Sequence, residues 1–312
     1  MTGEIRTLAP GFLTTVQDLG RYGYGELGVS PSGAADAVSL RMGNRLVGND
    51  EGAPALEMTL AGGSFAFELD AMVALTGSDF GPALGNRPIP MWESLTVRAG
   101  EILRMGGTRE GARCYLCVRG GIDVPLVLGS ASTHLLTGIG GVSGRALRKG
   151  DGLGVGRRFE SRPNATRVAP ASVHELFRRD RVRVTSGPQS DWFDDPARSA
   201  FHGSVYRVTE ESDRMGLRLE GTRIEPTHPG DLVTEGVALG AIQVPPHGHP
   251  IVLFVEHQTT GGYPKIANVI SADLHLVGQL RPRDALRFEQ VGLDRALALL
   301  CEREKVLDAL LA

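Results

Sequence analysis

The densest group of polar side chains in the sequence follows an apolar run, residues 251–255, near the C-terminal end. Residues 258–265 read QTTGGYPK, which combines an amide, two hydroxyl groups and a positive charge. The two glycines let backbone N–H groups approach a ligand closely. Thr259, Thr260 and Lys265 could therefore hold an anion or polarise a carbonyl group. The alternative is a tight polar turn that binds nothing.

A second group of polar side chains lies near the N-terminal end. Gln17, Asp18 and Arg21 stand among apolar residues and glycines. A carboxylate beside a guanidinium group can fix a loop or orient the carboxylate of a substrate, and the sequence leaves both uses open. Ser32 and Asp36 follow where a helix is expected to begin, and capping of that helix explains them without any further function.

Arg214 lies in a third polar run, residues 212–216, which reads SDRMG. Its guanidinium group could bind a carboxylate or a phosphate through two parallel hydrogen bonds. A structural turn that Arg214 forms together with Asp213 is the alternative. The run therefore supplies one candidate anchor for an anionic group.

Several other patterns that suggest ligands fail on closer reading. The glycine-rich residues 138–144 lack a following helix pattern, and no P-loop motif occurs. His247 and His249 have no third ligand nearby in the sequence, so no metal site is predicted. Cys114 and Cys117 lie in a β-prone run, where positions three apart face opposite sides of a strand. We expect both thiols to be buried in the core rather than to share a metal or a disulfide.

The elements that must position these groups are mostly strands. The 42 glycines and 18 prolines separate short apolar runs, which is typical of a mainly β fold with a few helices. Two helices are expected, at residues 34–46 and 294–311, from apolar residues at helical spacing. Cys301 lies on the second helix and is expected in the core. A linker-like stretch at residues 157–171 divides the chain into two predicted β-rich domains, residues 1–165 and 166–312, the latter ending in a helix.

The bulk composition excludes some functions. A net charge of -3 gives no electrostatic basis for binding nucleic acid. No apolar run approaches the roughly 20 residues of a membrane-spanning helix, and the N-terminal end shows no apolar signal region. The sequence therefore predicts a cytoplasmic protein without membrane contacts.

The polar runs also resemble a known family in order and content. The chain resembles the family of the 5-oxoprolinase C subunit and allophanate hydrolase subunit 2, which contains the biotin-dependent carboxyltransferase subdomains A and B. One departure is Arg283, at a position where the family commonly has glycine. The motifs that carry the resemblance are residues 16–21, 28–29, 32–36, 119–125, 128–130, 187–189, 191–193, 212–219, 235–236, 240–245 and 258–265.

The resemblance implies a fold and an activity. It implies two β-barrel-like units of the cyclophilin type, and a subunit of an ATP-dependent 5-oxoprolinase that opens 5-oxo-L-proline to L-glutamate. The implied partners are the enzyme's B subunit, which is similar to allophanate hydrolase subunit 1, and its A subunit. The resemblance does not say where ATP binds. The alternatives it implies are a carboxyltransferase or allophanate hydrolase subunit that acts on urea-type amides with a biotin carrier, and a regulatory antagonist of a kinase inhibitor.

Roles for individual residues follow as a hypothesis. Both enzyme activities act on an unreactive amide, so they need donors near a developing negative oxygen and a group that moves a proton. We expect the two polar ends of the sequence to line one cleft for a small amide substrate. The expected catalytic residues are Asp18 as base and Thr259, Thr260 and Lys265 as charge-stabilising groups. The expected substrate-binding residues are Gln17, Arg21, Ser32, Arg214, Gln258 and Tyr263.

Overall fold

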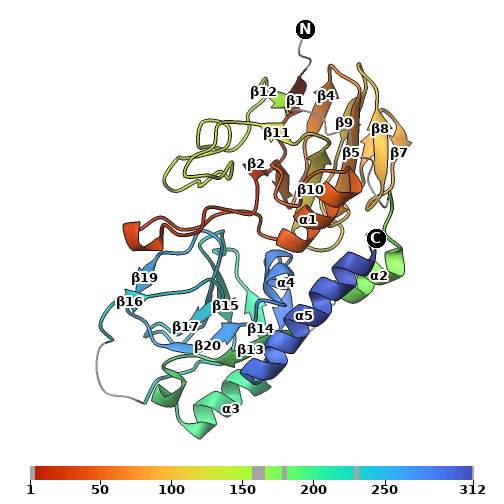
Figure 1. Ribbon diagram of the computed structural model, residues 1–312. Helices are drawn as coiled ribbons and strands as arrows, with labels where there is room; N and C mark the ends of the chain where they lie inside the picture. The colour runs from red at the N-terminus through yellow and green to blue at the C-terminus, as the bar shows by residue number, and fades with distance from the viewer. Residues whose placement is uncertain (1–3, 157–165, 178–180, 228–231, 311–312) are drawn as a thin grey trace. The chain divides into compact units, whose positions relative to one another are not determined.

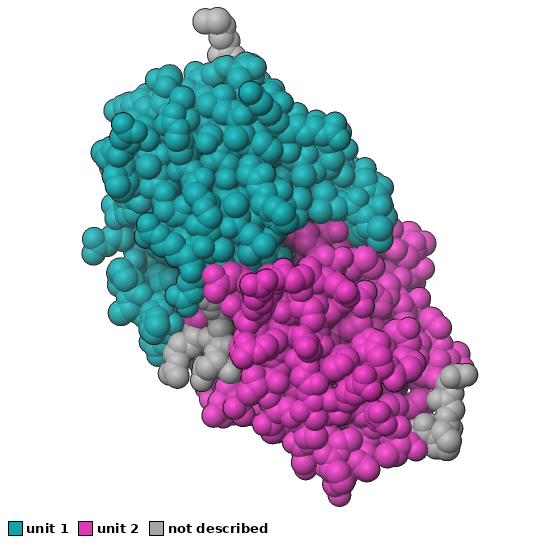
Figure 2. All heavy atoms as spheres, turned by 180° about the vertical axis from the view of Figure 1, so that it is seen from behind, with its two compact units in different colours: residues 1–21, 32–176, 307–312 teal, residues 22–31, 177–306 magenta. Residues whose placement is uncertain are grey.

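The computed structural model describes residues 4–156, 166–177, 181–227 and 232–310. The chain divides into two compact units, which Figure 2 colours separately. The first unit contains Met1–Arg21, Ser32–Leu176 and Leu307–Ala312, and the second contains Tyr22–Pro31 and Phe177–Val306. Most of the predicted linker, residues 157–165, lies outside the described residues.

The first unit contains two sheets of mostly antiparallel strands (Figure 1). The seven-stranded sheet has, in spatial order, β11 (Ile122–Asp123), β12 (Gly152–Val155), β1 (Ile5–Ala9), β4 (Ser64–Phe67), β9 (Ile102–Arg104), β6 (Ala83–Leu84) and β7 (Arg87–Pro88). The five-stranded sheet has, in the same way, β2 (Leu13–Gln17), β3 (Ala55–Thr59), β10 (Arg113–Val118), β5 (Ala71–Gly77) and β8 (Ser94–Val97).

A single apolar core joins the two sheets of the first unit. Phe65 and Leu103 of the larger sheet and Leu75 and Leu116 of the smaller sheet belong to one buried cluster. Strand periodicity explains this arrangement, since alternate residues of each strand point to the same face. Helix α1 (Ala37–Leu46) packs on β5 and β10, so both faces of the central strand β10 are covered.

The second unit is built on a sheet that nearly closes into a barrel. Its first and last strands, β21 and β22, are separated in the chain only by Arg287, so the sheet returns to its own starting edge. The spatial order is β21 (Ala285–Leu286), β14 (Tyr206–Val208), β15 (Gly216–Glu220), β18 (Ile251–Leu253), β17 (Ala241–Gln243), β20 (Lys265–Val269), β13 (Val182–Ser186) and β22 (Phe288–Gln290). A two-stranded sheet joins β16 (Glu235–Gly236) and β19 (Thr260–Gly261).

Helices are few and short apart from the last one. Helix α2 (Pro170–Leu176) belongs to the first unit, and α3 (Asp195–Gly203) and α4 (Leu274–Gly278) belong to the second. Two 3-10 turns, η1 (Gly25–Leu27) and η2 (Ser190–Trp192), also lie in the second unit, and α5 (Leu293–Leu310) closes the described chain. None of the helices in the described part of the chain is long and apolar enough to cross a bilayer.

The structure confirms most of the predicted elements. The fold is mainly β, with one sheet that nearly closes into a barrel and a few helices, and helices occupy the two predicted stretches. Cys114 and Cys117 are both fully buried, and burial raises the pKa of each thiol. Cys114 joins the core between the sheets, whereas the Cys117 Sγ lies 3.8 Å from the Leu40 carbonyl oxygen on the α1 side. The prediction for Cys301 is wrong, because α5 turns this residue to the exposed side.

Candidate functional site

Asp18 follows β2 in the first unit and accepts hydrogen bonds from four donors. The Oγ atoms of Ser130 and Ser132 lie 2.6 Å and 2.5 Å from its carboxylate, and the backbone N–H groups of Ala131 and Gly20 lie at 2.6 Å and 2.7 Å. The side chain is 8% exposed. These donors occupy most of the acceptor capacity of the carboxylate, so the geometry gives Asp18 a role in holding the 130–132 loop. A role as catalytic base stays a prediction.

Three further predicted site residues reach the same loop. Gln17 Nε2 and Ser32 Oγ donate to the Thr133 carbonyl oxygen, at 3.1 Å and 2.8 Å. A terminal nitrogen of the Arg21 guanidinium donates to the Ser132 carbonyl oxygen. All three side chains are buried. The structure therefore brings Gln17, Arg21 and Ser32 together with the 130–133 loop, of which only Ser130 lies in one of the motifs that carry the resemblance.

Of the two residues expected to cap the first helix, Asp36 does so. Its Oδ1 accepts a hydrogen bond from the Ser39 N–H at 2.9 Å at the start of α1. Ser32 lies outside the cap and has a φ of 56°. Its hydroxyl group serves the 130–133 loop described above.

Replacement of Asp18 by Asn is expected to destabilise the protein by roughly 2–4 kcal/mol, because an amide nitrogen would face groups that donate to the carboxylate. Urea unfolding followed by circular dichroism measures this change. Asp36→Asn is the matched control, since Asn caps a helix about as well as Asp and a small effect is expected. A free energy of unfolding for Asp18→Asn that equals the wild-type value would show that the four hydrogen bonds do not hold the loop.

In the second unit, Lys265 starts β20 and is paired with a carboxylate. Its Nζ lies 2.5 Å from Glu235 Oε1, and Gln189 Nε2 donates to the same oxygen at 2.8 Å. Gln189 Oε1 in turn accepts a hydrogen bond from the Lys265 N–H at 3.2 Å. The Lys265 side chain is 3% exposed, whereas that of Glu235 is 42% exposed. The ammonium group is thus fixed inside the protein by a partner that reaches solvent.

This pairing changes the protonation of Glu235. The close contact with the Lys265 ammonium group lowers the pKa of the Glu235 carboxyl group, and the hydrogen bond from Gln189 lowers it further. Sequence reasoning did not assign a role to Glu235 or Gln189. The signal was present, because both residues lie in motifs that carry the family resemblance.

The two threonines of the QTTGGYPK run lie at the small two-stranded sheet. Thr260 is in β19, opposite Gly236 of β16, and its side chain is exposed. The Thr259 carbonyl oxygen accepts a hydrogen bond from the Val237 N–H at 3.0 Å. Within the described residues, neither hydroxyl group has a hydrogen-bond partner, so both remain available to a ligand.

Gln258 and Tyr263 line a pocket of about 600 Å³ in the second unit. Gln258 Nε2 donates to Gln243 Oε1 at 3.2 Å, and Tyr263 is 45% exposed. The remaining lining residues are Asp213, Met215, Gly216, Arg218, Gln243, Pro245, Pro246, His247, Ile251 and Leu253. Lys265 is not among them.

Arg214 is buried and ion-paired. Its Nε lies 2.5 Å from Glu256 Oε1, and the two side chains are 5% and 3% exposed. The Glu256 N–H also donates to the Arg214 carbonyl oxygen at 2.8 Å. The pair joins the SDRMG run to the segment before Gln258, which gives Arg214 a structural use. Its predicted role in substrate binding stays a prediction.

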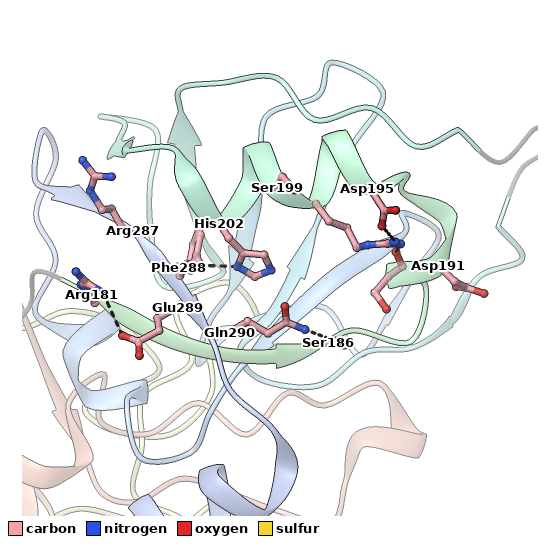
Figure 3. A pocket seen from close by; sticks show the side chains of 12 residues that line it. Arg181, Ser186, Asp191, Asp195, Ser199, His202, Arg287, Phe288, Glu289 and Gln290 are labelled. Carbon is pink, nitrogen blue, oxygen red and sulfur yellow. Dashed lines mark hydrogen bonds and ion pairs between the residues drawn. The ribbon is translucent and has the colours of Figure 1, made fainter.

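A pocket of about 780 Å³ lies beside α3, β13 and β22 (Figure 3). Two charged pairs lie in its wall: Arg198 contacts Asp195, and Arg181 lies 3.7 Å from Glu289. Gln290 Nε2 donates to Ser186 Oγ at 2.9 Å. None of the predicted site residues lines this pocket, so we do not assign it to the function.

The predicted site residues divide between the two units. Gln17, Asp18, Arg21 and Ser32 belong to the first, and the other six belong to the second. Within each unit the structure brings several of them together. The prediction that both groups line one cleft stays a prediction.

Comparisons with known proteins give consistent matches. The family described as carboxyltransferase domain, subdomain A and B, matches residues 27–290. The chain is 39% identical to the 5-oxoprolinase C subunit of Escherichia coli over 98% of this chain and 97% of that protein. It is 33% identical to urea amidolyase of Saccharomyces cerevisiae, over 95% of this chain and 17% of that protein. The crystal structure of urea carboxylase from Kluyveromyces lactis superposes with a TM-score of 0.92 and 33% identity, over 98% of this chain and 29% of that chain.

Proposed function

The chain belongs to the carboxyltransferase domain, subdomain A and B, family, and we propose that it acts as the C subunit of a 5-oxoprolinase. The observation that carries the proposal is the match to the 5-oxoprolinase C subunit of Escherichia coli, 39% identical over nearly the whole of both chains. The name of that relative implies other subunits. We propose as partners in the cytoplasm the B subunit, which is similar to allophanate hydrolase subunit 1, and the A subunit.

The proposed reaction opens a lactam with the free energy of ATP hydrolysis. ATP transfers its terminal phosphoryl group to the lactam carbonyl oxygen, water attacks the carbonyl carbon, and the ring C–N bond breaks to leave an acyl phosphate. A second water molecule hydrolyses this acyl phosphate. The products are L-glutamate, ADP and phosphate, and the ring nitrogen gains the proton that it needs to leave as an amine. ATP is used by the complex, and we assign no ATP site to this chain.

The chain contributes groups suited to the charge that develops on the carbonyl oxygen. Lys265 is a buried positive charge held by Glu235, and Thr259 and Thr260 provide hydroxyl groups that are not used within the described residues. Fixed donors of this kind stabilise a developing oxyanion because they need no reorganisation during the reaction. Gln258 and Tyr263 line the neighbouring pocket for the substrate.

A carboxyltransferase acting on a urea-type amide is the second candidate. The observation that favours it is the TM-score of 0.92 to the urea carboxylase structure. This reaction requires carboxybiotin on a carrier, whose carboxyl group is attacked by the amide nitrogen. The same positive charge and hydroxyl groups would then stabilise the carboxylate oxygens during transfer.

Co-purification with the two proposed partners, followed by an assay, separates the two candidates. The complex is expected to release L-glutamate from 5-oxo-L-proline in the presence of ATP, and to release none when ATP is omitted. Urea with a carboxylated biotin carrier serves as the comparison substrate. Carboxylation of urea without glutamate release would overturn the proposal in favour of the second candidate.

A further inference from the structure

A row of three side chains crosses the nearly closed sheet of the second unit. Ile251 of β18 pairs with Arg218 of β15 on one side and with Gln243 of β17 on the other. Side chains of directly paired residues point to the same face of a sheet, and neighbouring strands lie about 4.8 Å apart. Arg218, Ile251 and Gln243 therefore stand on one face, and all three line the pocket of about 600 Å³ that also contains Gln258 and Tyr263.

Gln243 presents a fixed and unused donor in this row. The residue is 1% exposed, and its Oε1 accepts a hydrogen bond from Gln258 Nε2 at 3.2 Å. Its Nε2, in contrast, is buried and donates to no residue in the part of the chain that the structure describes. A buried amide donor without an acceptor costs free energy, so such groups commonly mark a place where a ligand oxygen binds.

Gly261 leaves room for this amide group. A Cβ atom at Gly261 would lie 2.5 Å from Gln243 Nε2. This distance is shorter than a van der Waals contact, so any larger residue at Gly261 would push the amide away. The glycine in the QTTGGYPK run thus has a specific use beyond turn formation.

Arg218 supplies a positive charge at the other end of the row. Its side chain is exposed, and within the described ranges its guanidinium group has no hydrogen-bond or ion-pair partner. Asp213 lines the same pocket, but its Oδ1 accepts hydrogen bonds from the N–H groups of Met215 and Gly216, at 2.8 Å and 3.2 Å. The available cation is therefore suited to a carboxylate on the ligand, because guanidinium and carboxylate groups pair through two parallel hydrogen bonds.

We propose that this pocket binds a small molecule that carries both an amide carbonyl oxygen and a carboxylate. Gln243 Nε2 donates to the carbonyl oxygen, Arg218 pairs with the carboxylate, and Ile251 contacts the apolar carbon atoms between them. The proposal rests on the proposed function and deepens it, since 5-oxo-L-proline has both groups on one ring. It adds Gln243 and Arg218 as residues that determine specificity.

Calorimetric titration of the assembled complex tests the proposal with three probes. The probes are 5-oxo-L-proline, 2-pyrrolidinone, which lacks the carboxylate, and L-proline, which lacks the ring carbonyl group. Gln243→Glu keeps the acceptor for Gln258 but removes the donor, and is expected to weaken binding of the first two probes by roughly 10–100-fold. Arg218→Met is expected to weaken binding of 5-oxo-L-proline by a similar factor and to leave 2-pyrrolidinone unchanged.

Arg223→Met serves as the matched control, because Arg223 is also exposed but does not line the pocket. Thermal unfolding verifies that each variant folds. Unchanged affinity for 5-oxo-L-proline in both Gln243→Glu and Arg218→Met, or absence of binding in the wild type, would overturn the inference. If the complex binds 5-oxo-L-proline through these residues but releases no glutamate, the proposed function fails and the pocket assignment stands.

Discussion

Replacement of Lys265 by Met in the assembled complex is expected to lower kcat for glutamate release by roughly 10²–10³-fold, the usual effect of removing one donor that stabilises an oxyanion. The ammonium group is buried and held 2.5 Å from Glu235 Oε1, so its position is fixed before substrate binds. Because Met has a similar length and the Glu235 side chain is 42% exposed, the carboxylate left behind stays solvated and the fold is retained.

A change in the Glu235 carboxyl group provides an independent check of this variant. In the wild type, the close contact with the Lys265 ammonium group lowers the pKa of Glu235. In Lys265→Met that pKa is expected to rise toward the ordinary value of a glutamate side chain, which an NMR titration of the side chain measures. The direction also sets a pH dependence: the ion pair stabilises the fold above the unfolded-state pKa, and this contribution is lost as pH falls through the lower folded-state pKa.

Glu235→Gln is the matched variant for Lys265. It keeps the shape of the partner but removes its charge, so the ammonium group stays in place with weaker restraint. A loss of kcat much smaller than that of Lys265→Met is expected. Unchanged kcat in Lys265→Met, measured on a folded complex, would remove Lys265 from the catalytic groups.

Replacement of Arg214 by Met is expected to destabilise the protein by about 3–5 kcal/mol, because it leaves the buried Glu256 carboxylate without its partner. Glu256→Leu alone is expected to lower the free energy of unfolding by a similar amount, since it removes the carboxylate that pairs with the buried Arg214 guanidinium group. The double variant is expected to cost much less than the sum, because an apolar pair can replace a buried ion pair of similar volume. Urea unfolding of all four proteins completes the cycle.

The same cycle tests the predicted role of Arg214 in substrate binding. An arginine that anchors substrate would raise KM when it is replaced, with little change in the free energy of unfolding. A loss of stability within about 1 kcal/mol for Arg214→Met, joined to a large increase in KM, would contradict the structural assignment. The side chain is only 5% exposed, which is why we expect stability to respond instead.

Local patterns in the sequence were sufficient for much of the fold. Helix α1 was predicted from apolar spacing and from Asp36 at its start, and both features involve residues within one turn of each other. Strand periodicity alone was sufficient to predict that the side chains of Cys114 and Cys117 point to opposite faces of the sheet. The prediction that Cys301 is buried was wrong. A helix at the surface has one exposed side, and the spacing of apolar residues on α5 did not show on which side the sulfur lies.

Pairings between distant residues could not be predicted in the same way. The parallel pair of β13 and β22 joins Val182 to Phe288, and nothing local in either strand specifies the other. The serine partners of Asp18 lie 112 and 114 residues away in the sequence. The partners of Lys265, which are Glu235 and Gln189, come from two separate motifs. Composition identified groups able to do chemistry, but only the fold shows which of them already use their hydrogen-bonding capacity on each other.

Arg283 has a backbone conformation that favours glycine. Its φ is 75°, a region of backbone space that glycine enters without steric cost and other residues rarely adopt. Glycine, which the family resemblance led us to expect at this position, would adopt this conformation without steric cost. In this chain the Arg283 Nε lies 3.0 Å from Glu210 Oε1, a surface ion pair that glycine could not form.

The chain passes four times from one unit to the other, at 21/22, 31/32, 176/177 and 306/307. Neither unit is therefore one uninterrupted stretch of polypeptide, and a cut after Leu176 would separate residues 22–31 from the rest of their own unit. A gene fragment that encodes only half of this chain would thus specify an incomplete unit. Both units are therefore expected to be inherited together as one continuous stretch of sequence. In agreement, urea amidolyase of Saccharomyces cerevisiae matches 95% of this chain within a far longer polypeptide.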